Sequence, residues 1–210
     1  MKYLDKLTTE LNKFNHWAKA YPQKQHNYEW ELNYNDWQQL RSAFFKYIHN
    51  VKLDEFCQAN IDDIIYLIAR DNEMEEFITE IGKNRELFQL ILSKTFESNE
   101  ADAKWQFAVE LSNCVIGHKE TEKALLRLVV DKDEYTSRRA LQSLGIIKSP
   151  HTEKLCIKAW ASNHEYQRIM VLWVLKDLNS SHLQSYLKKA KEDGRKYLVQ
   201  NAIEIKNNVS

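Results

Sequence analysis

Cationic and aromatic side chains carry most of the chemistry that this sequence could offer, and the cations gather in its second half. Residues 101–210 hold 18 Lys and Arg against 13 Asp and Glu, whereas residues 1–100 hold 12 against 17. The chain is neutral as a whole, but its second half is positive. A positive half favours anionic partners such as phosphates or an acidic protein surface, although solvated helix faces give the same composition.

The candidate binding residues are cations and tryptophans that helical spacing places on shared surfaces. Lys154 and Lys158 lie one helical turn apart, and Lys189 follows Lys158 after 31 residues. Such a ridge could attract phosphate or carboxylate groups, and a plain solvated helix face is the alternative. The full candidate set is Arg138, Arg139, Lys154, Lys158, Trp160, Arg168, Trp173 and Lys189.

No complete catalytic, cofactor or metal set is present in the sequence. The four glycines are isolated, so no phosphate-cradling loop is indicated. His151 and His182 lack two further metal ligands, and the acidic run at residues 71–76 lacks the oxygen-ligand spacing of a calcium loop. We therefore expect a protein that is not an enzyme, without catalytic residues, metal or cofactor.

The cysteines and the N-terminal residues indicate the cellular compartment of the protein. Cys57, Cys114 and Cys156 are odd in number, widely spaced and set in apolar runs, which predicts reduced thiols in the core. The N-terminus is charged, and no stretch approaches 18 consecutive apolar residues. We expect a cytoplasmic protein that does not enter membranes.

The elements that would position these residues are helices. Only four glycines and two prolines occur in 210 residues, which cannot supply the turns of a β-sandwich or barrel. The hydrophobic fraction of 43% predicts a packed core. An all-α fold follows.

A period of about 31 residues organises the second half. Trp105, Tyr135, Tyr166 and Tyr197 recur at intervals of 30, 31 and 31 residues. The same spacing aligns further apolar columns, which should form one buried seam. In the first helix of each unit these are Leu111, Leu141, Leu172 and Ile203, and then Cys114, Leu144 and Leu175. In the second helix they are Leu125, Leu155 and Tyr186; Leu126, Cys156 and Leu187; Val129, Ala159 and Ala190.

Helix-breaking residues separate the two helices of each unit and the units themselves. Gly117-His118, Ser149-Pro150 and Asn179-Ser180-Ser181 fall inside the units, and Asn163 and Asp193-Gly194 fall between them. The predicted units cover about 101–131, 132–162 and 163–193, with a half-unit at 194–207. One such hairpin cannot bury its apolar face alone, so stacking into a right-handed α-solenoid is expected.

Residues 1–100 show no clear period. Helices are predicted at Tyr3–Lys19, Asn35–His49, Asp54–Asp71, Met74–Gly82 and Arg85–Phe96. Asn35 or Asp36 is a suitable N-cap, and residues 21–34 form the best loop candidate. This region is expected to pack on the same solenoid, either as diverged hairpins or as a cap of other helices.

Residues 133–145 resemble the first helix of a HEAT repeat, with an acidic start, a basic centre and a closing Leu144-Gly145. The resemblance extends over about residues 101–205. It implies a surface for proteins, and sometimes nucleic acids, on the concave face that the second helices form.

Residues 166–177 also resemble a helix of the AlkD-like DNA glycosylases, which are HEAT-like proteins with a basic DNA groove. The resemblance implies that Trp173 stacks on DNA, while Tyr135 and Arg138-Arg139 partly match that family's Trp and paired Arg. The family's catalytic Asp has no counterpart between Thr136 and Leu144. The alternative for Trp173 is a place in the core.

Two functions therefore remain open from the sequence. The first is a non-catalytic interaction protein that binds a protein partner on the concave solenoid face. The second is a nucleic-acid-binding protein of the AlkD-like type. In that case the phosphate contacts would come from Arg138, Arg139, Lys158, Arg168 and Lys189. Affinity that falls steeply with salt would distinguish the second function from the first.

Overall fold

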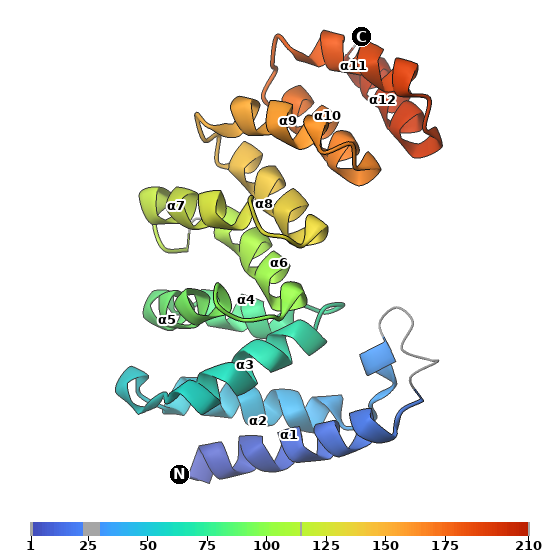
Figure 1. Cartoon of the computed structure of the whole chain (residues 1–210). Helices are drawn as coiled ribbons and strands as arrows, with labels where there is room; N and C mark the ends of the chain where they lie inside the picture. The colour runs from blue at the N-terminus through green and yellow to red at the C-terminus, as the bar shows by residue number, and fades with distance from the viewer. Residues whose placement is uncertain (1, 23–29, 114, 210) are drawn as a thin grey trace. The chain divides into compact units, whose positions relative to one another are not determined.

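The computed structural model describes residues 2–22, 30–113 and 115–209, which form twelve α-helices and short 3-10 turns without a β-strand in those ranges (Figure 1). The all-α prediction is therefore confirmed over the described residues. The chain divides into two compact units, Met1–Phe107 and Ala108–Ser210.

The first unit contains five helices and most of a sixth. They are α1 (Lys2–Ala20), α2 (Trp37–Asn50), α3 (Gln58–Arg70), α4 (Glu76–Gly82), α5 (Arg85–Thr95) and α6 (Ala101–Glu110), with 3-10 turns at η2 (Trp30–Asn33) and η3 (Leu53–Glu55). Part of the predicted loop at 21–34 lies outside the described residues. Asp36 is the N-cap of α2, but its side chain makes no capping hydrogen bond.

Aromatic rings join the helices of the first unit. Phe44 of α2 stacks on Phe77 of α4 with ring centroids 4.2 Å apart, and both rings are fully buried. Phe14 of α1 contacts Tyr34 and Trp37 at 5.1 and 5.3 Å. Such pairs add specific geometry to the burial of a large apolar area.

Two sequence expectations in the first unit are wrong. The predicted helix at 54–71 is interrupted, because the extended backbone at Cys57 separates η3 from α3. Cys57 is therefore an exposed residue at the N-cap of α3 and not a core thiol. Cys156 is fully buried as expected, and Cys114 lies outside the described residues.

The second unit continues with alternating helices that end at the predicted breakers. They are η4 (Leu111–Asn113), α7 (His118–Leu128), α8 (Glu134–Ile146), α9 (Thr152–Ala161), α10 (Glu165–Asp177), α11 (Leu183–Asp193) and α12 (Lys196–Val209). We call α8, α10 and α12 the A helices and α7, α9 and α11 the B helices.

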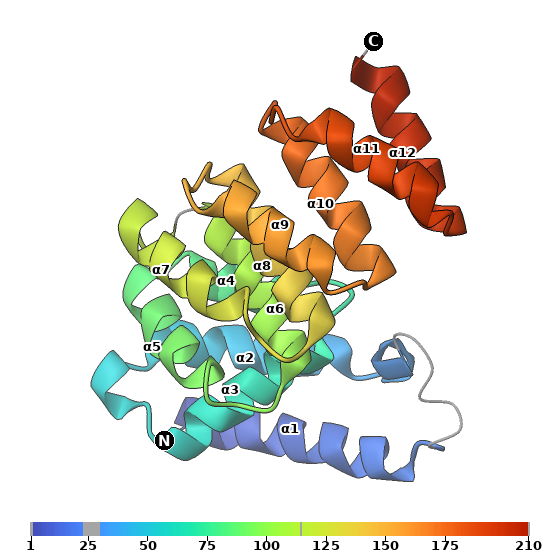
Figure 2. The same cartoon turned by 45° about the horizontal axis from the view of Figure 1, so that its top comes forward.

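The A helices pack on one another in chain order. Helix α10 packs directly against α8 and α12, and each B helix packs against the A helices that precede or follow it. In the described part of this unit, no comparable packing joins α7 to α9 or α9 to α11. Figure 2 shows α7, α9 and α11 following one another along one side of this unit.

The turns inside successive hairpins share their backbone geometry. The amide of Ser149 donates to Leu144 O at 3.0 Å, and one period further along the chain the amide of Ser180 donates to Leu175 O at 2.9 Å. Lys148 and Asn179 take the same left-handed conformation, with φ of 55° and 52°. These bonds satisfy carbonyls that the helix end would otherwise leave open.

Most of the predicted apolar columns are buried. Leu141 and Leu172 of the A helices are fully buried, as are Leu144 and Leu175. In the B helices Leu125, Cys156 and Ala190 are fully buried as well. Leu141, Leu172 and Leu175 from the A helices and Cys156 and Ala190 from the B helices belong to one core cluster.

Two columns depart from the prediction. Ile203 of α12 is 47% exposed, whereas Leu198, Ala202 and Ile205 of the same helix are buried. The tyrosine column was expected to belong to the buried seam, yet Tyr135, Tyr166 and Tyr197 are 37%, 48% and 51% exposed. These rings sit in the first turn of each A helix, where the chain leaves the core.

Candidate functional site

The three turns that lead into the A helices share one hydrogen-bond pattern. Asp131, Ser162 and Asp193 follow one another at the period of the apolar columns, and each side chain accepts a hydrogen bond from the backbone amide two residues later. Such local bonds hold the backbone in a turn and fix where the next helix begins. One edge of the second unit is therefore rigidly defined at three successive positions.

Side chains of the A helices also bind the ends of the preceding B helices. Ser137 Oγ donates to Val129 O at 2.8 Å, and at the same place in the next hairpin Arg168 Nε donates to Trp160 O at 3.0 Å. The two bonds use different side chains for the same purpose, which is to satisfy a carbonyl at a helix C-terminus.

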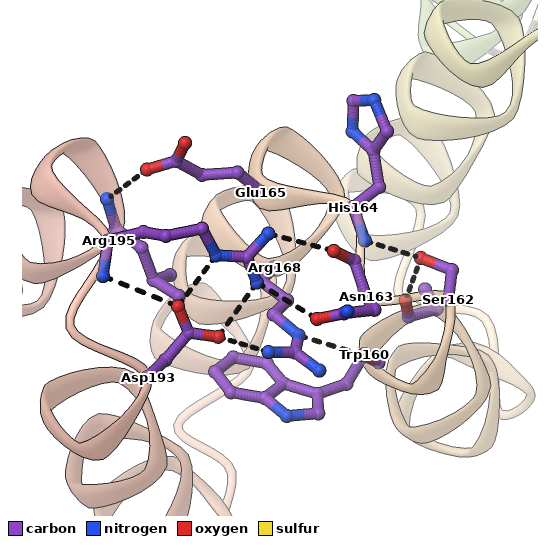
Figure 3. A network of polar contacts seen from close by, with 10 residues as sticks. Trp160, Ser162, Asn163, His164, Glu165, Arg168, Asp193 and Arg195 are labelled. Atoms are coloured by element: carbon purple, nitrogen blue, oxygen red, sulfur yellow. Dashed lines mark hydrogen bonds and ion pairs between the residues drawn. The ribbon is translucent and has the colours of Figure 1, made fainter.

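Asp193 is the centre of a network of charged groups at this edge (Figure 3). Its carboxylate accepts from Arg195 Nε at 2.6 Å and Nη2 at 2.7 Å, and it forms an ion pair with Arg168. The hydrogen bonds from Arg195 hold the pKa of Asp193 well below its usual range, and those from Arg168 add to this. Asp193 is therefore ionised at neutral pH.

The network connects the turn before α10 to the start of α12. Arg195 Nη1 donates to Asn163 O at 2.8 Å, and Nη2 donates to Asn163 Oδ1 at 3.2 Å. Glu165 Oε1 accepts from the amides of Tyr197 and Leu198, both at 3.1 Å, which is the favourable place for an anion at a helix N-terminus. These contacts position α12 relative to α10.

The exposed tyrosines lie along this edge with an arginine between two of them. The guanidinium of Arg138 lies 4.7 Å from the ring centroid of Tyr135 and 5.3 Å from that of Tyr166. Its Nε also donates to Glu134 at 3.0 Å. We call Tyr135, Tyr166 and Tyr197 the tyrosine row. The row presents aromatic faces held in place by a cation.

The two candidate tryptophans occupy different environments. Trp160 is buried against Tyr186, at 4.9 Å between ring centroids, and the guanidinium of Arg168 lies 5.0 Å from its ring centroid. Trp173 is half-buried on α10, and its Nε1 donates to Asn201 Oδ1 at 2.7 Å. Trp160 is thus part of the core, whereas Trp173 keeps one part at the surface.

The lysine candidates lie on the B helices and are exposed. Lys154 and Lys158 project from α9, and Lys189 projects from α11 with its ammonium 4.4 Å from the Tyr186 ring. Arg127 of α7 is exposed 31 residues before Lys158, so the cation ridge extends to a third helix. The sequence interpretation missed Arg127, because its columns align the first two B helices at 30 residues and place Leu128 opposite Lys158.

The structure thus separates the sequence-predicted residues into two groups. The arginines and Trp173 belong to the A helices, with Arg138 paired to Glu134, Arg139 bonded to Gln142 and Arg168 paired to Asp193. The lysines form a separate ridge on the B helices. The sequence interpretation placed Asn163 and Asp193 in the turns between units without a charged network, and it gave no role to Gln167.

Burial also raises the pKa of titratable groups outside this edge, among them Asp71 and Cys156. Burial raises the pKa of Asp71 to about 6, although the amide of Phe77 donates to it at 3.0 Å. Burial raises the pKa of Cys156 to about 12. Asp71 belongs to the first unit, and Cys156 lies in the core of the second. Within residues 2–22, 30–113 and 115–209, no three His, Cys, Asp or Glu side chains are arranged to hold a metal ion.

Comparisons with family models, with curated proteins and with solved structures find no match for this chain. Among the described residues, no helix has the length and apolar character needed to cross a membrane.

Proposed function

We propose that this protein is a non-catalytic, HEAT-like helical repeat protein that holds a protein partner on the exposed face of its A helices. The tyrosine row, with Arg138 between Tyr135 and Tyr166, is the observation that carries this proposal.

Recurring hydrogen bonds support the repeat architecture. Side chains that fix the turns before the A helices recur with the period of the sequence, and so do the backbone bonds of the turns inside the hairpins. A fold built from one supersecondary unit has this property, because each unit meets the same neighbours. A stack of HEAT-like hairpins is therefore the best account of residues 101–210.

Packing differences support the A helices as the inner face of such a stack. The A helices pack against one another directly, whereas the B helices pack against A helices. In a curved array of paired helices, the more closely spaced helices lie on the inside, where partners are held. The HEAT resemblance implied the opposite face, formed by the second helices.

Side-chain chemistry also favours the A helices. Interface centres are enriched in Tyr, Trp, Met and Arg and depleted of Lys. The A-helix face contains the tyrosine row, Arg138 and Arg139, together with half-buried Met170 and Trp173. The B-helix ridge contains mainly lysines, which is the composition of a solvated surface.

The proposal is tested by capture of partners from native cell extract with the full chain as bait. One variant carries Tyr135→Ser, Tyr166→Ser and Tyr197→Ser, and its matched control carries Lys154→Ser, Lys158→Ser and Lys189→Ser. Truncating a single hot-spot tyrosine costs about 2 kcal/mol, or about 30-fold in affinity. We expect at least one partner to be retained by wild type and control but lost from the tyrosine variant.

The control variant can also contradict the proposal. A partner that survives the tyrosine changes and is lost with the lysine changes would place the interface on the B helices. Because all six side chains are exposed, both variants should retain the fold. Circular dichroism of both variants checks this.

A second candidate function is nucleic-acid binding by the B-helix ridge. Arg127, Lys158 and Lys189 lie 31 residues apart on three successive B helices, a spacing that suits repeated phosphate contacts. The arginines of the AlkD-like resemblance fit this role less well. Arg168 and Arg138 are engaged by Asp193 and Glu134.

A further inference from the structure

The turn between α11 and α12 contains a dipeptide that can react with itself. Asp193 is followed by Gly194, and no other glycine of the chain follows an aspartate or an asparagine. The amide nitrogen of the glycine can attack the side-chain carboxyl carbon of the aspartate, so that water leaves and a five-membered succinimide ring forms. Glycine favours this attack, because it has no Cβ atom to hinder the approach of its own nitrogen.

Hydrolysis of such a ring changes the course of the backbone. Water adds to either carbonyl of the ring, which gives back aspartate or leaves isoaspartate. In isoaspartate the chain continues through the former side-chain carboxyl carbon, so the backbone gains one atom. One water is lost and one is regained, and the reaction needs no oxidant, metal or co-substrate. At Asp193 it would lengthen the turn that leads into α12.

The structure engages both reacting groups of this dipeptide. Asp193 Oδ1 accepts from the amide of Arg195 at 3.4 Å, a bond that spans Gly194. The amide of Gly194, which would have to attack, donates to Ala190 O at 3.4 Å where α11 ends. The nitrogen is therefore part of the helix end, in the left-handed conformation that glycine adopts readily.

Two arginines hold the carboxyl group in its unreactive, ionised form (Figure 3). Arg195 donates to it through Nε at 2.6 Å and Nη2 at 2.7 Å, and Arg168 forms an ion pair with it. These contacts, chiefly the hydrogen bonds from Arg195, hold the pKa of Asp193 below its usual range. A carboxylate resists a nucleophile, because it is negatively charged and must take up protons before its oxygen can leave as water.

We propose that Asp193-Gly194 is a latent site of isoaspartate formation, which Arg168 and Arg195 keep inactive while α12 is docked on α10. Arg168 belongs to α10, and Arg195 donates to Asn163 O at 2.8 Å in the turn before α10. Separation of the two helices removes both restraints. The modification then makes the separation permanent, because the lengthened turn no longer places Arg195 against Asn163. This inference goes beyond the proposed function and involves no partner.

The test measures isoaspartate at residue 193 by mass spectrometry of proteolytic peptides, after the purified full chain has been stored for several weeks at neutral pH. A capped synthetic peptide of residues 189–199 cannot form the network and gives the unprotected rate. We expect the full chain to convert at least about tenfold more slowly than the peptide, which is the effect of one hydrogen bond to a charged group.

Three variants assign the protection to the network. Arg195→Ala removes the side-chain bonds from that residue to Asp193 and should raise the rate about tenfold over wild type. Its matched control is Lys191→Ala, which removes an exposed cation that makes none of these contacts and should keep the wild-type rate. Adding Gly194→Ala to Arg195→Ala should suppress conversion again, because the new Cβ hinders the attack whether or not the turn is kept.

Circular dichroism shows whether Arg195→Ala is folded. If it is not, Arg195→Lys takes its place, because lysine keeps the positive charge and loses the paired donors of the guanidinium. We expect Arg195→Lys to convert faster than wild type and more slowly than the peptide. Conversion of wild type at the rate of the peptide would overturn the inference. So would a folded arginine variant that converts no faster than Lys191→Ala.

Discussion

Asp193 receives hydrogen bonds from two arginines, one on α10 and one in the turn before α12, and its side chain is only 8% exposed. These contacts are partly buried, so water can compensate in part for a lost partner. We therefore expect Asp193→Asn to lower the free energy of unfolding by about 1.5 kcal/mol in urea titrations, as for a hydrogen bond to a charged group. The control is Asp177→Asn, whose side chain is 67% exposed, with an expected loss below about 0.5 kcal/mol.

The pH dependence of this network has a definite sign. The pKa of Asp193 is lower in the folded chain than in the unfolded one, where it is about 3.9. The stabilisation is therefore complete above the unfolded pKa and is lost as the pH falls through the folded pKa. Equal urea midpoints for wild type and Asp193→Asn at pH 7 would show that the network contributes nothing.

The contribution of Asp71 to stability has the opposite dependence on pH. Burial raises its folded pKa to about 6, above the unfolded value of about 3.9, so its contribution is greatest at low pH and is lost as the pH rises through 6. Asp71→Asn keeps an acceptor for Phe77, and Arg41 keeps its bond to Glu76 at 2.9 Å. We expect the variant to gain about 1.5 kcal/mol over wild type between pH 5 and pH 8.

The measurement for Asp71 is the difference in urea unfolding between variant and wild type at the two pH values. Asp54→Asn changes an exposed carboxylate and should show no such dependence. A difference that is the same at pH 5 and pH 8 would contradict the raised pKa.

Helices α8 and α10 approach each other closely at Gly145. A Cβ atom added there would lie 2.9 Å from Val174 Cγ1, and valine has little freedom to move aside. Although alanine favours a helix by about 1 kcal/mol over glycine, overpacking costs about 1–3 kcal/mol. We expect Gly145→Ala to destabilise the protein by about 1 kcal/mol, as measured by urea unfolding.

A double-mutant cycle identifies the cause of that loss. Val174→Ala removes the methyl groups that the new Cβ would meet, so the double variant should be more stable than the sum of the single losses by about 1 kcal/mol or more. Strict additivity would mean that the two helices do not constrain each other at this point.

The ends of the helices in the second unit were predictable because local residues determine them. Ser149-Pro150, Asn163 and Asp193-Gly194 mark turns whose geometry depends on a few neighbouring residues. The buried columns were predictable for a similar reason, since the period of the sequence reports which side of a helix meets the next hairpin. The exposure of Ile203 was not predictable, because the period does not report which side of α12 is covered.

The candidate site was less accessible to prediction. Spacing identified the tyrosine row but assigned it to the core, because periodicity does not distinguish a buried column from a repeated surface position. The pairing of Arg168 with Asp193 joins distant positions on different helices, and single-sequence patterns carry no such information. Asp131, Ser162 and Asp193 recur with the period of the sequence and could have indicated the turns before the A helices. The sequence interpretation followed only the apolar columns.

At the scale of the whole chain, charge limits what the protein can bind. The chain has 30 basic and 30 acidic residues, so no net field attracts a polyanion. Local attraction would come from the B-helix ridge, where Arg127, Lys158 and Lys189 supply three spaced cations. Because each phosphate contact contributes about −0.9 to the slope of log K against log salt, three contacts give about −3.

We therefore predict weak and shallow salt dependence for duplex DNA. Fluorescence anisotropy of labelled duplex with the full chain should give a slope no steeper than about −3, with binding lost near physiological salt. Lys158→Ser should reduce the slope by about 1, since it removes one phosphate contact. A slope of about −6 or steeper requires more cations than the ridge contains. It would favour nucleic acid over a protein as the partner of this chain.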